Sequence, residues 1–465
     1  MIKGLPNRKI LLKKLPEKFP DSLPNGAGLY AVGGAIRDTL LAGCSPRELD
    51  ILMTGVEVKN VLRILRRFGK ARLVGQSFTV IKWHPKNTGR IVDVSLPSKR
   101  DISQPGETKF DISMSVEEDL AERDFTVDAM ALNLITGKFI DPFGGQKDLK
   151  NGILRTVKDS SLRADPIRCL RAAYICARCR LAPDKKTLDM IKSAAPKLKH
   201  VAQERIGEEL KKLMLELDKP SEALKLWLEW GLTDIILPEL MEGVGVTQEG
   251  GWHAYDVFEH GLKTVDAAPR KTDVRLAALF HDAGKPRRRK YMPEKDRATF
   301  YGHQNVSERM AKHALKRLKF PGKTIDRVTR LVRNHMFTHA ETDKGVRRFI
   351  RRVGEDILDE LFELRYADIE AQGTARDDTP DRKYEIRVRK ILKEKPPLST
   401  RDLAIGGKDI MQILGIDESP EIGKVLNHLL EIVLDNPELN KKETLISEMH
   451  AFAVSSGIVH EDFAG

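Results

Sequence analysis

Two acidic residues lie two positions apart near the N-terminus of the chain. Glu48 and Asp50 flank Leu49 at the start of an apolar run, residues 51–53. Side chains alternate along a β-strand, so residues two apart project from the same face and these carboxylates point the same way. Adjacent carboxylates repel each other, and a pair of divalent metals bound by carboxylates and nucleotide phosphates would relieve that repulsion. The spacing therefore predicts metal-dependent phosphate chemistry, with a solvated strand face as the alternative.

A glycine pair precedes these acids. Residues 29–32 are apolar and suit a buried strand, Gly33 and Gly34 turn the chain sharply, and residues 35–41 start a short helix. Such a turn lets backbone N–H groups approach an anion closely, and the dipole of the helix favours a phosphate there. The segment therefore predicts a phosphate-binding turn, although a Gly-Gly turn by itself is common.

A third acid, Asp93, lies between Val92 and Val94 in a later apolar stretch. A carboxylate in an apolar strand costs free energy unless it is paired or binds a metal. Asp93 is therefore a candidate third carboxylate of the same centre, and an edge position facing water is the alternative.

A second group of residues with metal-ligand chemistry begins beyond residue 252. Imidazole and carboxylate together suit divalent transition metals or a mixed metal pair, and an adjacent His-Asp doublet can place two ligands on one centre. A single histidine in helical sequence is usually structural, so the prediction depends on the whole group. Its members are His260, His281, Asp282 and Asp368, with His303 and His335 as further candidates.

The elements expected around these residues change in character near residue 154. Before it, residues 56–68 have the spacing of an amphipathic helix, and alternating or apolar runs predict strands of one small sheet at 71–74, 78–83 and 90–96. Residues 97–114 are polar and predict a flexible loop. After residue 154 only helical periodicity remains. We therefore predict an α+β fold, in which a small sheet domain is followed by helices alone.

The composition indicates several domains and a polyanionic partner. The chain has 465 residues, with 80 Lys and Arg against 68 Asp and Glu, a net charge of +12. Aromatic residues make up only 6%, so contacts to phosphates are expected rather than stacking on a wide aromatic platform. The four cysteines are too few for a disulfide framework, and no run approaches membrane-spanning length. We expect a cytoplasmic protein without a membrane partner.

The order of the N-terminal features resembles a known enzyme family. Gly-Gly-x-x-Arg-Asp at 33–38, followed by acid-x-acid at 48–50, resembles the signature of the DNA polymerase beta-like nucleotidyltransferases. The whole stretch is similar to the head of class II tRNA nucleotidyltransferases and bacterial poly(A) polymerases. That family usually has Asp-x-Asp, so Glu48 is a departure. The resemblance implies nucleotide contacts by Gly33, Gly34, Arg37 and Asp38, and two Mg²⁺ held by Glu48, Asp50 and Asp93.

A second motif of the head follows at residues 123–128. Arg123-Asp124-Phe125-Thr126 and Asp128 resemble the family's Arg-Arg-Asp-Phe-Thr-x-Asn-Ala, with Glu122 and Asp128 as departures. The resemblance implies that Arg123 holds triphosphate oxygens, that Asp124 holds the ribose hydroxyls, and that Asp128 also contacts the nucleotide. A structural Arg–Asp ion pair is the alternative.

A third motif lies at the start of the helical region. Asp165 and Arg168 are spaced i,i+3 on a predicted helix, and Arg171 and Arg178 lie on roughly the same face. They resemble the family's Glu-Asp-x-x-Arg motif, with Ala164 in place of the Glu. The resemblance implies that this acid and arginine hydrogen-bond the base edge of CTP or ATP, because the pair offers acceptors and a planar donor fork, with Arg171 as a further nucleotide contact. An intrahelical ion pair is the alternative.

The histidine group has a resemblance of its own. The order His…His-Asp…Asp, with Gly284-Lys285-Pro286 after the doublet, is similar to the HD phosphohydrolase domain of many bacterial tRNA nucleotidyltransferases. The resemblance implies a divalent metal, of a kind that the sequence does not specify, that activates water against phosphoesters.

Together these features predict an enzyme that adds CCA to the 3′ end of tRNA from CTP and ATP. The predicted domains are a nucleotidyltransferase head at 1–152, a helical neck at 153–220, an HD domain at 221–395 and a helical tail at 396–465. The alternatives are a partial enzyme that adds C, CC or A, a poly(A) polymerase, a phosphohydrolase with an RNA-binding head, and a non-catalytic RNA chaperone.

Overall fold

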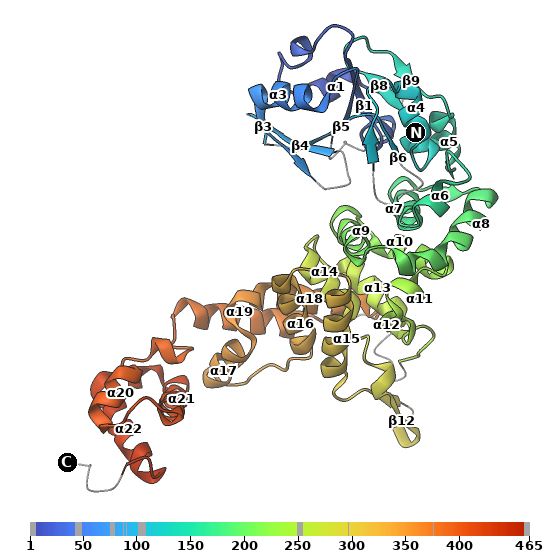
Figure 1. Cartoon of the computed structure of the whole chain (residues 1–465). Coiled ribbons are helices and arrows are strands. Elements are labelled where there is room, and N and C mark those ends of the chain that lie inside the picture. The colour runs from blue at the N-terminus through green and yellow to red at the C-terminus, as the bar shows by residue number, and fades with distance from the viewer. Residues whose placement is uncertain are drawn as a thin grey trace. The chain divides into compact units, whose positions relative to one another are not determined.

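The computed structural model separates into two compact units, residues 1–238 and 239–465 (Figure 1). It describes residues 6–41, 49–74, 80–86, 88–89, 91–100, 108–248, 254–295, 297–374 and 376–459. The first unit contains a mixed sheet followed by helices, and the second is mainly helical. The predicted α+β fold is therefore confirmed.

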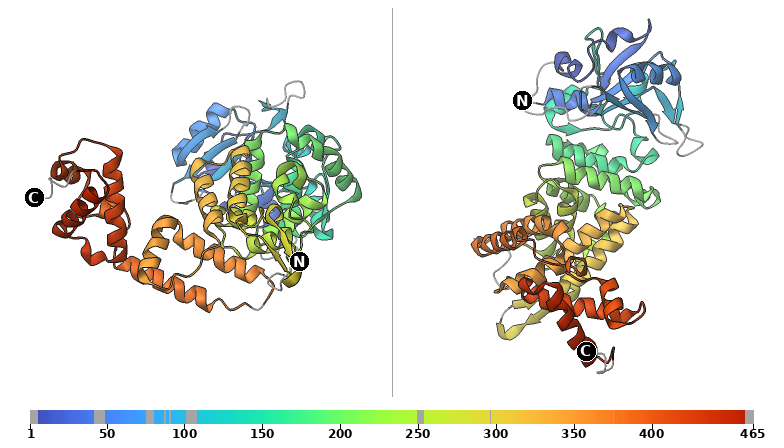
Figure 2. Two further views of the ribbon diagram at one scale, coloured as in Figure 1. Left: turned by 90° about the horizontal axis from the view of Figure 1, so that it is seen from below. Right: turned by 90° about the vertical axis from the view of Figure 1, so that its left-hand side faces the viewer.

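The head is built on a seven-stranded sheet with the strand order β3-β4-β5-β2-β1-β8-β9. Neighbouring strands are antiparallel except for β2 and β5, which run parallel. Helices α2 (Gly34–Leu40) and α3 (Val58–Phe68) pack against it (Figure 2). The strands are β1 (Gly28–Val32), β2 (Leu49–Thr54), β3 (Gly69–Val74), β4 (Val80–Pro85), β5 (Val92–Ser95), β8 (Ala131–Asn133) and β9 (Phe139–Ile140).

Strand β5 shows why these residues form a sheet. Val92 and Val94 are buried while Asp93 and Ser95 are only half-buried, as alternation along a strand requires. Because β5 lies between β4 and β2, Asp93 is on an interior strand and not at the edge of the sheet.

The predicted loop at 97–114 contains a short ribbon at its ends. Strand β6 (Ser98–Arg100) pairs antiparallel with β7 (Thr108–Phe110), and residues 101–107 are outside the described part of the chain. A two-stranded ribbon has no need of one continuous apolar face, so its sequence lacks the alternation that identifies the larger sheet.

The neck differs from the prediction at its first helix. Helix α6 (Ser161–Ala164) ends before Asp165, and α7 (Arg168–Cys179) begins three residues later. The prediction that one helix includes both Asp165 and Arg168 is wrong. Pro166 disfavours helical backbone at the residue before it, and Asp165 is extended with φ −145° and ψ 92°. The later neck helices are α8 (Lys185–Ala194), α9 (Gln203–Glu216) and α10 (Pro220–Glu229).

The second unit is a bundle in which α13, α14, α16 and α18 pack against one another and α15 packs on α14 and α16. Asp256 begins α13 by accepting a hydrogen bond from the backbone N–H of Glu259. The helices are α13 (Val257–Ala267), α14 (Thr272–Phe280), α15 (His303–Arg317), α16 (Gly322–Asn334), α17 (Asp343–Val353) and α18 (Leu358–Ala371).

The hairpin of this unit was not predicted, whereas a helix in its most charged segment agrees with the prediction. Strands β12 (Lys290–Met292) and β13 (Arg297–Thr299) form a hairpin, so the expectation of helices alone after residue 154 is wrong. Helix α19 (Thr379–Lys393) lies in a charged stretch, yet its buried residues Tyr384, Val388 and Ile391 recur at helical spacing. These three residues form a narrow apolar stripe on a helix whose other side chains are mostly charged.

The tail consists of α20 (Gly407–Leu414), α21 (Pro420–Asp435) and α22 (Lys442–Ser455) around a small apolar core that includes Ile410, Val425 and Leu429. Among the described helices, none has both the length and the apolar character needed to cross a membrane.

Candidate functional site

Two of the three predicted head carboxylates face each other across neighbouring strands. Asp50 on β2 and Asp93 on β5 are register partners in the parallel pair. Lys82 on β4 is the register partner of Asp93 on its other side, and its Nζ donates to Asp93 Oδ2 at 2.6 Å. Glu48 lies outside the described residues. The pairing places two carboxylates and one ammonium group side by side. Lys82 was not predicted, because it lies two strands from Asp50 and no local pattern in the sequence indicates it.

The glycine turn adjoins this carboxylate pair. Gly33 has φ 62° and ψ −136°, a backbone conformation that side-chain-bearing residues rarely adopt. A Cβ atom at Gly33 would lie 3.0 Å from Arg123 Nη1 and 3.7 Å from Asp50 Oδ2, and one at Gly34 would lie 3.1 Å from Arg37 Nη2. The structure thus brings together the turn, one predicted metal ligand and the arginine predicted to hold triphosphate oxygens.

A buried network follows Arg37 at the start of α2. Its Nη1 donates to Asp128 Oδ1 at 2.7 Å, and its Nη2 donates to Asp38 Oδ1 at 3.1 Å. Arg178 of α7 donates to the other oxygen of Asp38. Burial raises the pKa of Asp128 above its ordinary value, and the charge of Arg37 offsets only part of that rise. Asp128, which replaces the family's Asn, therefore orients Arg37 through a charge-assisted hydrogen bond.

Asp124 of the head pairs with an arginine of the neck. Arg171 Nη2 of α7 lies 3.0 Å from Asp124 Oδ2. Burial favours the neutral acid, but Arg171 and Arg168 outweigh it and lower the pKa of Asp124, so this carboxylate stays charged. A small cavity of about 100 Å³ lies between residues of the head and helix α7. Its lining includes Asp50, Arg37, Asp38, Asp128, Arg171 and Arg178.

Asp165 and Arg168 are both buried, and each is held by a residue outside the predicted pair. Arg205 of α9 donates to both oxygens of Asp165, at 3.1 and 2.8 Å. Arg168 donates to the hydroxyl of Ser161 and, through Nη2, to the Glu122 carbonyl at 3.0 Å. Arg205 is 40 positions from Asp165, so periodicity could not identify it.

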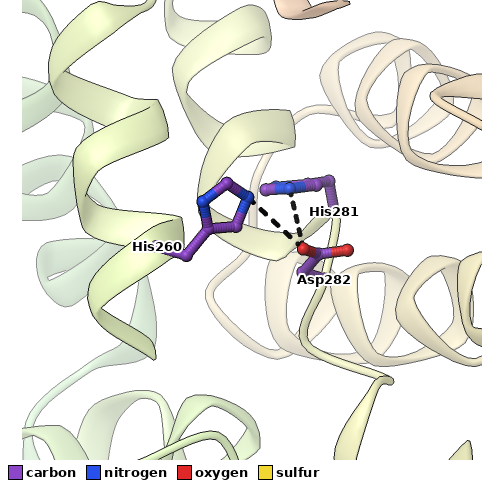
Figure 3. Close-up of side chains that lie close together, drawn as sticks. All are labelled: His260, His281 and Asp282. Atoms are coloured by element: carbon purple, nitrogen blue, oxygen red, sulfur yellow. Dashed lines mark ion pairs between the residues drawn. The ribbon is translucent and has the colours of Figure 1, made fainter. Parts of the chain in front are cut away.

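The six residues of the histidine group lie together in the second unit, all of them buried. His260 is on α13, Asp368 is on α18, His303 begins α15, and His281 and His335 directly follow α14 and α16. Figure 3 shows His260 and His281 directed at Asp282. Predictions made from residues spread over more than 100 positions thus converge on one cluster.

Asp282 lies between two sets of ligand atoms. Its Oδ2 is 3.5 Å from His260 Nε2 and 3.2 Å from His281 Nε2. Its Oδ1 is 3.1 Å from His303 Nε2 and 3.7 Å from His335 Nε2. Asp368 Oδ1 completes the first set at 3.0 Å from His260 Nε2. Three members of the first set, His260, His281 and Asp282, have ligand atoms close enough to hold one metal ion. So do Asp282, His303 and His335, and Asp282 belongs to both groups.

The four histidines share one orientation. The Nδ1 atoms of His281, His303 and His335 lie 2.7, 2.8 and 2.7 Å from the carbonyls of Ala278, Phe300 and Val332. Nδ1 of His260 lies 3.4 Å from the carbonyl of Ala371. A carbonyl can only accept, so Nδ1 bears a hydrogen, and in the neutral ring Nε2 presents a lone pair toward the cluster.

Two details show that this cluster fits a cation. His303 Nε2 and His335 Nε2 are 3.2 Å apart, and with both hydrogens on Nδ1 their lone pairs face each other. His281 Nε2 is buried and makes no hydrogen bond to the described residues, although Asp282 Oδ2 is close. Nitrogen and carboxylate donors of this kind suit transition metals.

The charges in the cluster are set by its own members. Burial raises the pKa of Asp282, but His281 and Lys285 outweigh it and hold that pKa well below the usual range. Burial and the charges of His281 and His303 lower the pKa of His335 to about 3. Burial also lowers the pKa of His281, yet Asp282 and Asp368 raise it to about 10. A protonated His281 therefore stabilises the two carboxylates when no metal does.

A cavity of about 640 Å³ opens onto this cluster. Asp282, His303, His335 and Asp368 line it, as do the cations Lys285, Arg297, Arg365 and Arg376. Lys285 Nζ lies 2.6 Å from Asp282 Oδ2 and donates to Gln248 Oε1 at 2.6 Å. The four cations give the cavity the charge expected of a site for a phosphate-bearing ligand.

Known protein families match the head and also the regions that follow it. The poly A polymerase head domain family matches residues 29–155, the family described as "Probable RNA and SrmB- binding site of polymerase A" matches 180–243, and tRNA nucleotidyltransferase domain 2 matches 296–449. The fold is similar to that of the Bacillus stearothermophilus CCA-adding enzyme in complex with CTP, with a TM-score of 0.66 and 23% identity over 97% of this chain and 98% of that one.

Curated relatives are similar over most of their lengths. The A-adding tRNA nucleotidyltransferase of Deinococcus radiodurans is 37% identical over 68% of this chain and 75% of the relative. The CC-adding tRNA nucleotidyltransferase of Thermus thermophilus is 33% identical over 91% of this chain and 93% of the relative. By its sequence and its fold, this chain belongs to the tRNA nucleotidyltransferase family of enzymes.

Proposed function

We propose that the protein adds CCA to the 3′ end of tRNA, using CTP and ATP, at the sheet of the head. The observation that supports this most directly is the register of Asp50 with Asp93 beside the Gly33 turn and Arg123. In the proposed reaction the 3′ oxygen of the tRNA forms a bond to the α-phosphorus of the nucleotide. The bond between the α- and β-phosphates breaks, and pyrophosphate leaves.

The carboxylates of Glu48, Asp50 and Asp93 would hold Mg²⁺ in this site, since carboxylate oxygens are the ligands that this ion prefers. Bound Mg²⁺ would activate the 3′ hydroxyl and neutralise charge on the triphosphate. Lys82 already provides one positive charge at Asp93. Arg123 and Arg37 would bind phosphate oxygens, because both adjoin the glycine turn.

The neck would choose the nucleotide. Asp165 and Arg168 are buried and fixed by Arg205, Ser161 and the Glu122 carbonyl, so they offer donors and acceptors in set positions. Rigid polar groups discriminate between bases better than mobile ones, because a wrong base leaves them unpaired. Asp124, paired with Arg171, would hold the ribose, and Arg171 lines the small cavity.

The product distribution tests this function. The protein would be incubated with tRNA transcripts that lack the final three, two or one nucleotides, with CTP alone, ATP alone and both. A CCA-adding enzyme extends all three transcripts to full length with both nucleotides. Extension that stops after CC, or that starts only on tRNA ending in CC, would indicate a partial enzyme, and a long A tract would indicate a poly(A) polymerase.

We propose a second, separate activity for the histidine cluster, the hydrolysis of phosphoesters. His260, His281 and Asp282 would hold one divalent metal, with Asp368 beside them, and Asp282, His303 and His335 would hold another. Bound metals would polarise the phosphoryl oxygens and lower the pKa of a bound water. A water oxygen forms a bond to phosphorus, the P–O bond to the ribose breaks, and the leaving oxygen takes up a proton. Lys285 Nζ pairs with Asp282 Oδ2 and donates to Gln248, so it would orient Asp282 at the cavity wall.

A further inference from the structure

Arg365 lies one turn of α18 from the carboxylate Asp368, and both line the large cavity. Residues three apart on a helix are neighbours on one face, with Cβ atoms about 5–6 Å apart. The cavity therefore presents a guanidinium group next to the proposed metal cluster but not within its set of ligands.

Buried contacts fix this guanidinium in place. Arg365 Nε donates to Asp381 Oδ1 at 2.8 Å, and the guanidinium carbon lies 5.4 Å from the centre of the Phe337 ring. Asp381 is only 2% exposed, and its Oδ1 also lies 3.1 Å from His339 Nε2. Within the described parts of the chain, the hydrogen bonds of Arg365 use Nε alone. Both Nη groups remain as donors at the cavity wall.

The cavity wall carries cations besides the lysine that pairs with the cluster. Lys285 is engaged by Asp282 and Gln248 at the cluster itself. Arg376 and Arg297 also line the cavity, and Arg376 Nη2 is 4.0 Å from Asp381 Oδ2. Two arginines thus share one buried carboxylate, which leaves a net positive charge on that part of the wall. Its volume of about 640 Å³ also exceeds the space that a lone phosphate fills.

We propose that Arg365 and Arg376 form a second phosphate subsite. This inference rests on the proposed hydrolase, since it describes the substrate of that same cavity. The ligand is a ribonucleotide with two phosphate groups: one at the metal cluster is hydrolysed, and the other is bound by the arginines and does not react. The planar fork of Arg365 suits two phosphate oxygens at once. Free nucleoside bisphosphates and RNA chains that end in a 3′-phosphate share this chemistry.

Asp381 is a positioning residue for the subsite. Its carboxylate fixes the Nε edge of Arg365, so the Nη edge faces the cavity in one orientation. Replacing Asp381 by Asn keeps the size of the side chain but removes the charge that holds both arginines. The substitution should weaken binding of the second phosphate without changing any group at the cluster.

Hydrolysis by the full-length protein with a divalent metal tests the subsite. Release of phosphate would be compared for adenosine 3′,5′-bisphosphate, adenosine 3′-monophosphate and a short oligoribonucleotide with a 3′-phosphate. We expect the wild-type protein to favour the two-phosphate substrates by at least about tenfold in kcat/KM, mainly through KM, the scale of a charge-assisted hydrogen-bond pair. Whether the bisphosphate or the oligonucleotide is preferred identifies the source of the ligand.

Variants separate the subsite from the chemistry. Arg365→Ala should lower kcat/KM for the bisphosphate by roughly 10- to 100-fold and leave the monophosphate within about threefold. Arg365→Lys, which keeps the charge, and Asp381→Asn should give smaller losses of the same kind, mainly in KM. Arg382→Ala is the matched control, because this arginine is on α19 beside Asp381 but pairs with Asp378.

Equal losses for both substrates in folded Arg365→Lys would overturn the subsite and leave the hydrolase intact, as would a wild-type enzyme that treats both substrates alike. If no metal supports hydrolysis of any substrate, the proposed hydrolase fails. Calorimetric binding of adenosine 3′,5′-bisphosphate then decides the subsite, because the head is the same in wild type and variant. At least a tenfold weaker affinity in Arg365→Ala supports the subsite, and an unchanged affinity overturns it.

Discussion

Asp50 and Asp93 are paired in register on the two parallel strands of an otherwise antiparallel sheet. Their register places the carboxylate of a residue 43 positions later in the chain beside the first, on the same face. Lys82 on the next strand donates to Asp93, so the pair is balanced on one side by an ammonium group.

Removing either carboxylate should disable nucleotide addition. We expect Asp50→Ala and Asp93→Ala to lower CTP incorporation by about 100-fold or more, the scale of losing one charged group that stabilises a phosphoryl-transfer transition state. Asp159→Ala is the control, because that acid pairs with Lys186 at the exposed surface. Incorporation by Asp93→Ala within a few-fold of the wild type would remove Asp93 from the site.

Glu48 should be an active substitute for aspartate. It keeps the charge and both oxygens but adds a methylene group, and Mg²⁺ requires near-octahedral geometry at about 2.0–2.1 Å. We expect Glu48→Asp to remain active, with a higher ratio of Mg²⁺ to Mn²⁺ activity than the wild type, and Glu48→Ala to lose at least as much as Asp50→Ala. Near wild-type addition by a folded Glu48→Ala protein would mean that the first carboxylate lies elsewhere.

Arg168 should set nucleotide choice. Its donors are fixed by Ser161 and the Glu122 carbonyl, so Arg168→Ala should reduce the preference for CTP and ATP over UTP and GTP. The measurement is kcat/KM for each nucleotide on tRNA that lacks the end. Equal loss for all four would reduce Arg168 to a structural role. Arg163→Ala, one turn earlier in the neck, should leave the preference unchanged.

The histidine cluster should be separable from nucleotide addition. His281→Ala combined with Asp282→Ala should abolish metal-dependent phosphoesterase turnover and leave addition within a few-fold of the wild type. Both activities would be assayed on the same folded preparation, with circular dichroism as the check. A double variant that is folded but cannot add nucleotides would contradict the assignment of two independent sites.

Metal binding at the cluster should release a proton. Without metal, Asp282 and Asp368 raise the pKa of His281 to about 10, so this ring is protonated at neutral pH. A metal needs the neutral ring, so metal affinity should rise as pH rises toward 10, and about one proton should leave per His281 that becomes a ligand. Calorimetry in buffers of different ionisation enthalpy measures that proton. Zero release between pH 6 and 8 would contradict the binding of metal by a protonated His281.

Local patterns predicted the parts of the fold that depend on local interactions. The strand, turn and helix around Gly33 follow from apolar runs and glycines, and the α3 helix follows from its spacing. The break at Asp165 could have been predicted from Pro166, which acts only on its neighbour. The β12–β13 hairpin could not, because a short exposed ribbon has no periodic apolar face.

In the candidate sites too, the residues that local sequence indicates were predicted, and the residues that only the fold brings near were not. Residue type and order predicted which histidines and acids share a cluster, since ligand chemistry restricts the choice to few residue types. The residues that orient them were missed, because Lys82, Arg205 and Asp381 act through contacts that only the folded chain creates. The i,i+3 spacing of Arg365 and Asp368 was a local signal for Arg365 at the cavity wall.

The carbonyl groups that hold Nδ1 of the four histidines have a consequence for metal exchange. Three of these carbonyls lie only three residues before the histidine that they hold, and two of them, of Ala278 and Val332, belong to the last turns of α14 and α16. We expect the head to have the same melting temperature with and without the metal. The metal-free cluster should bind the ion again without refolding of the protein. Supply of the ion could then switch one activity on and off while tRNA maturation continues.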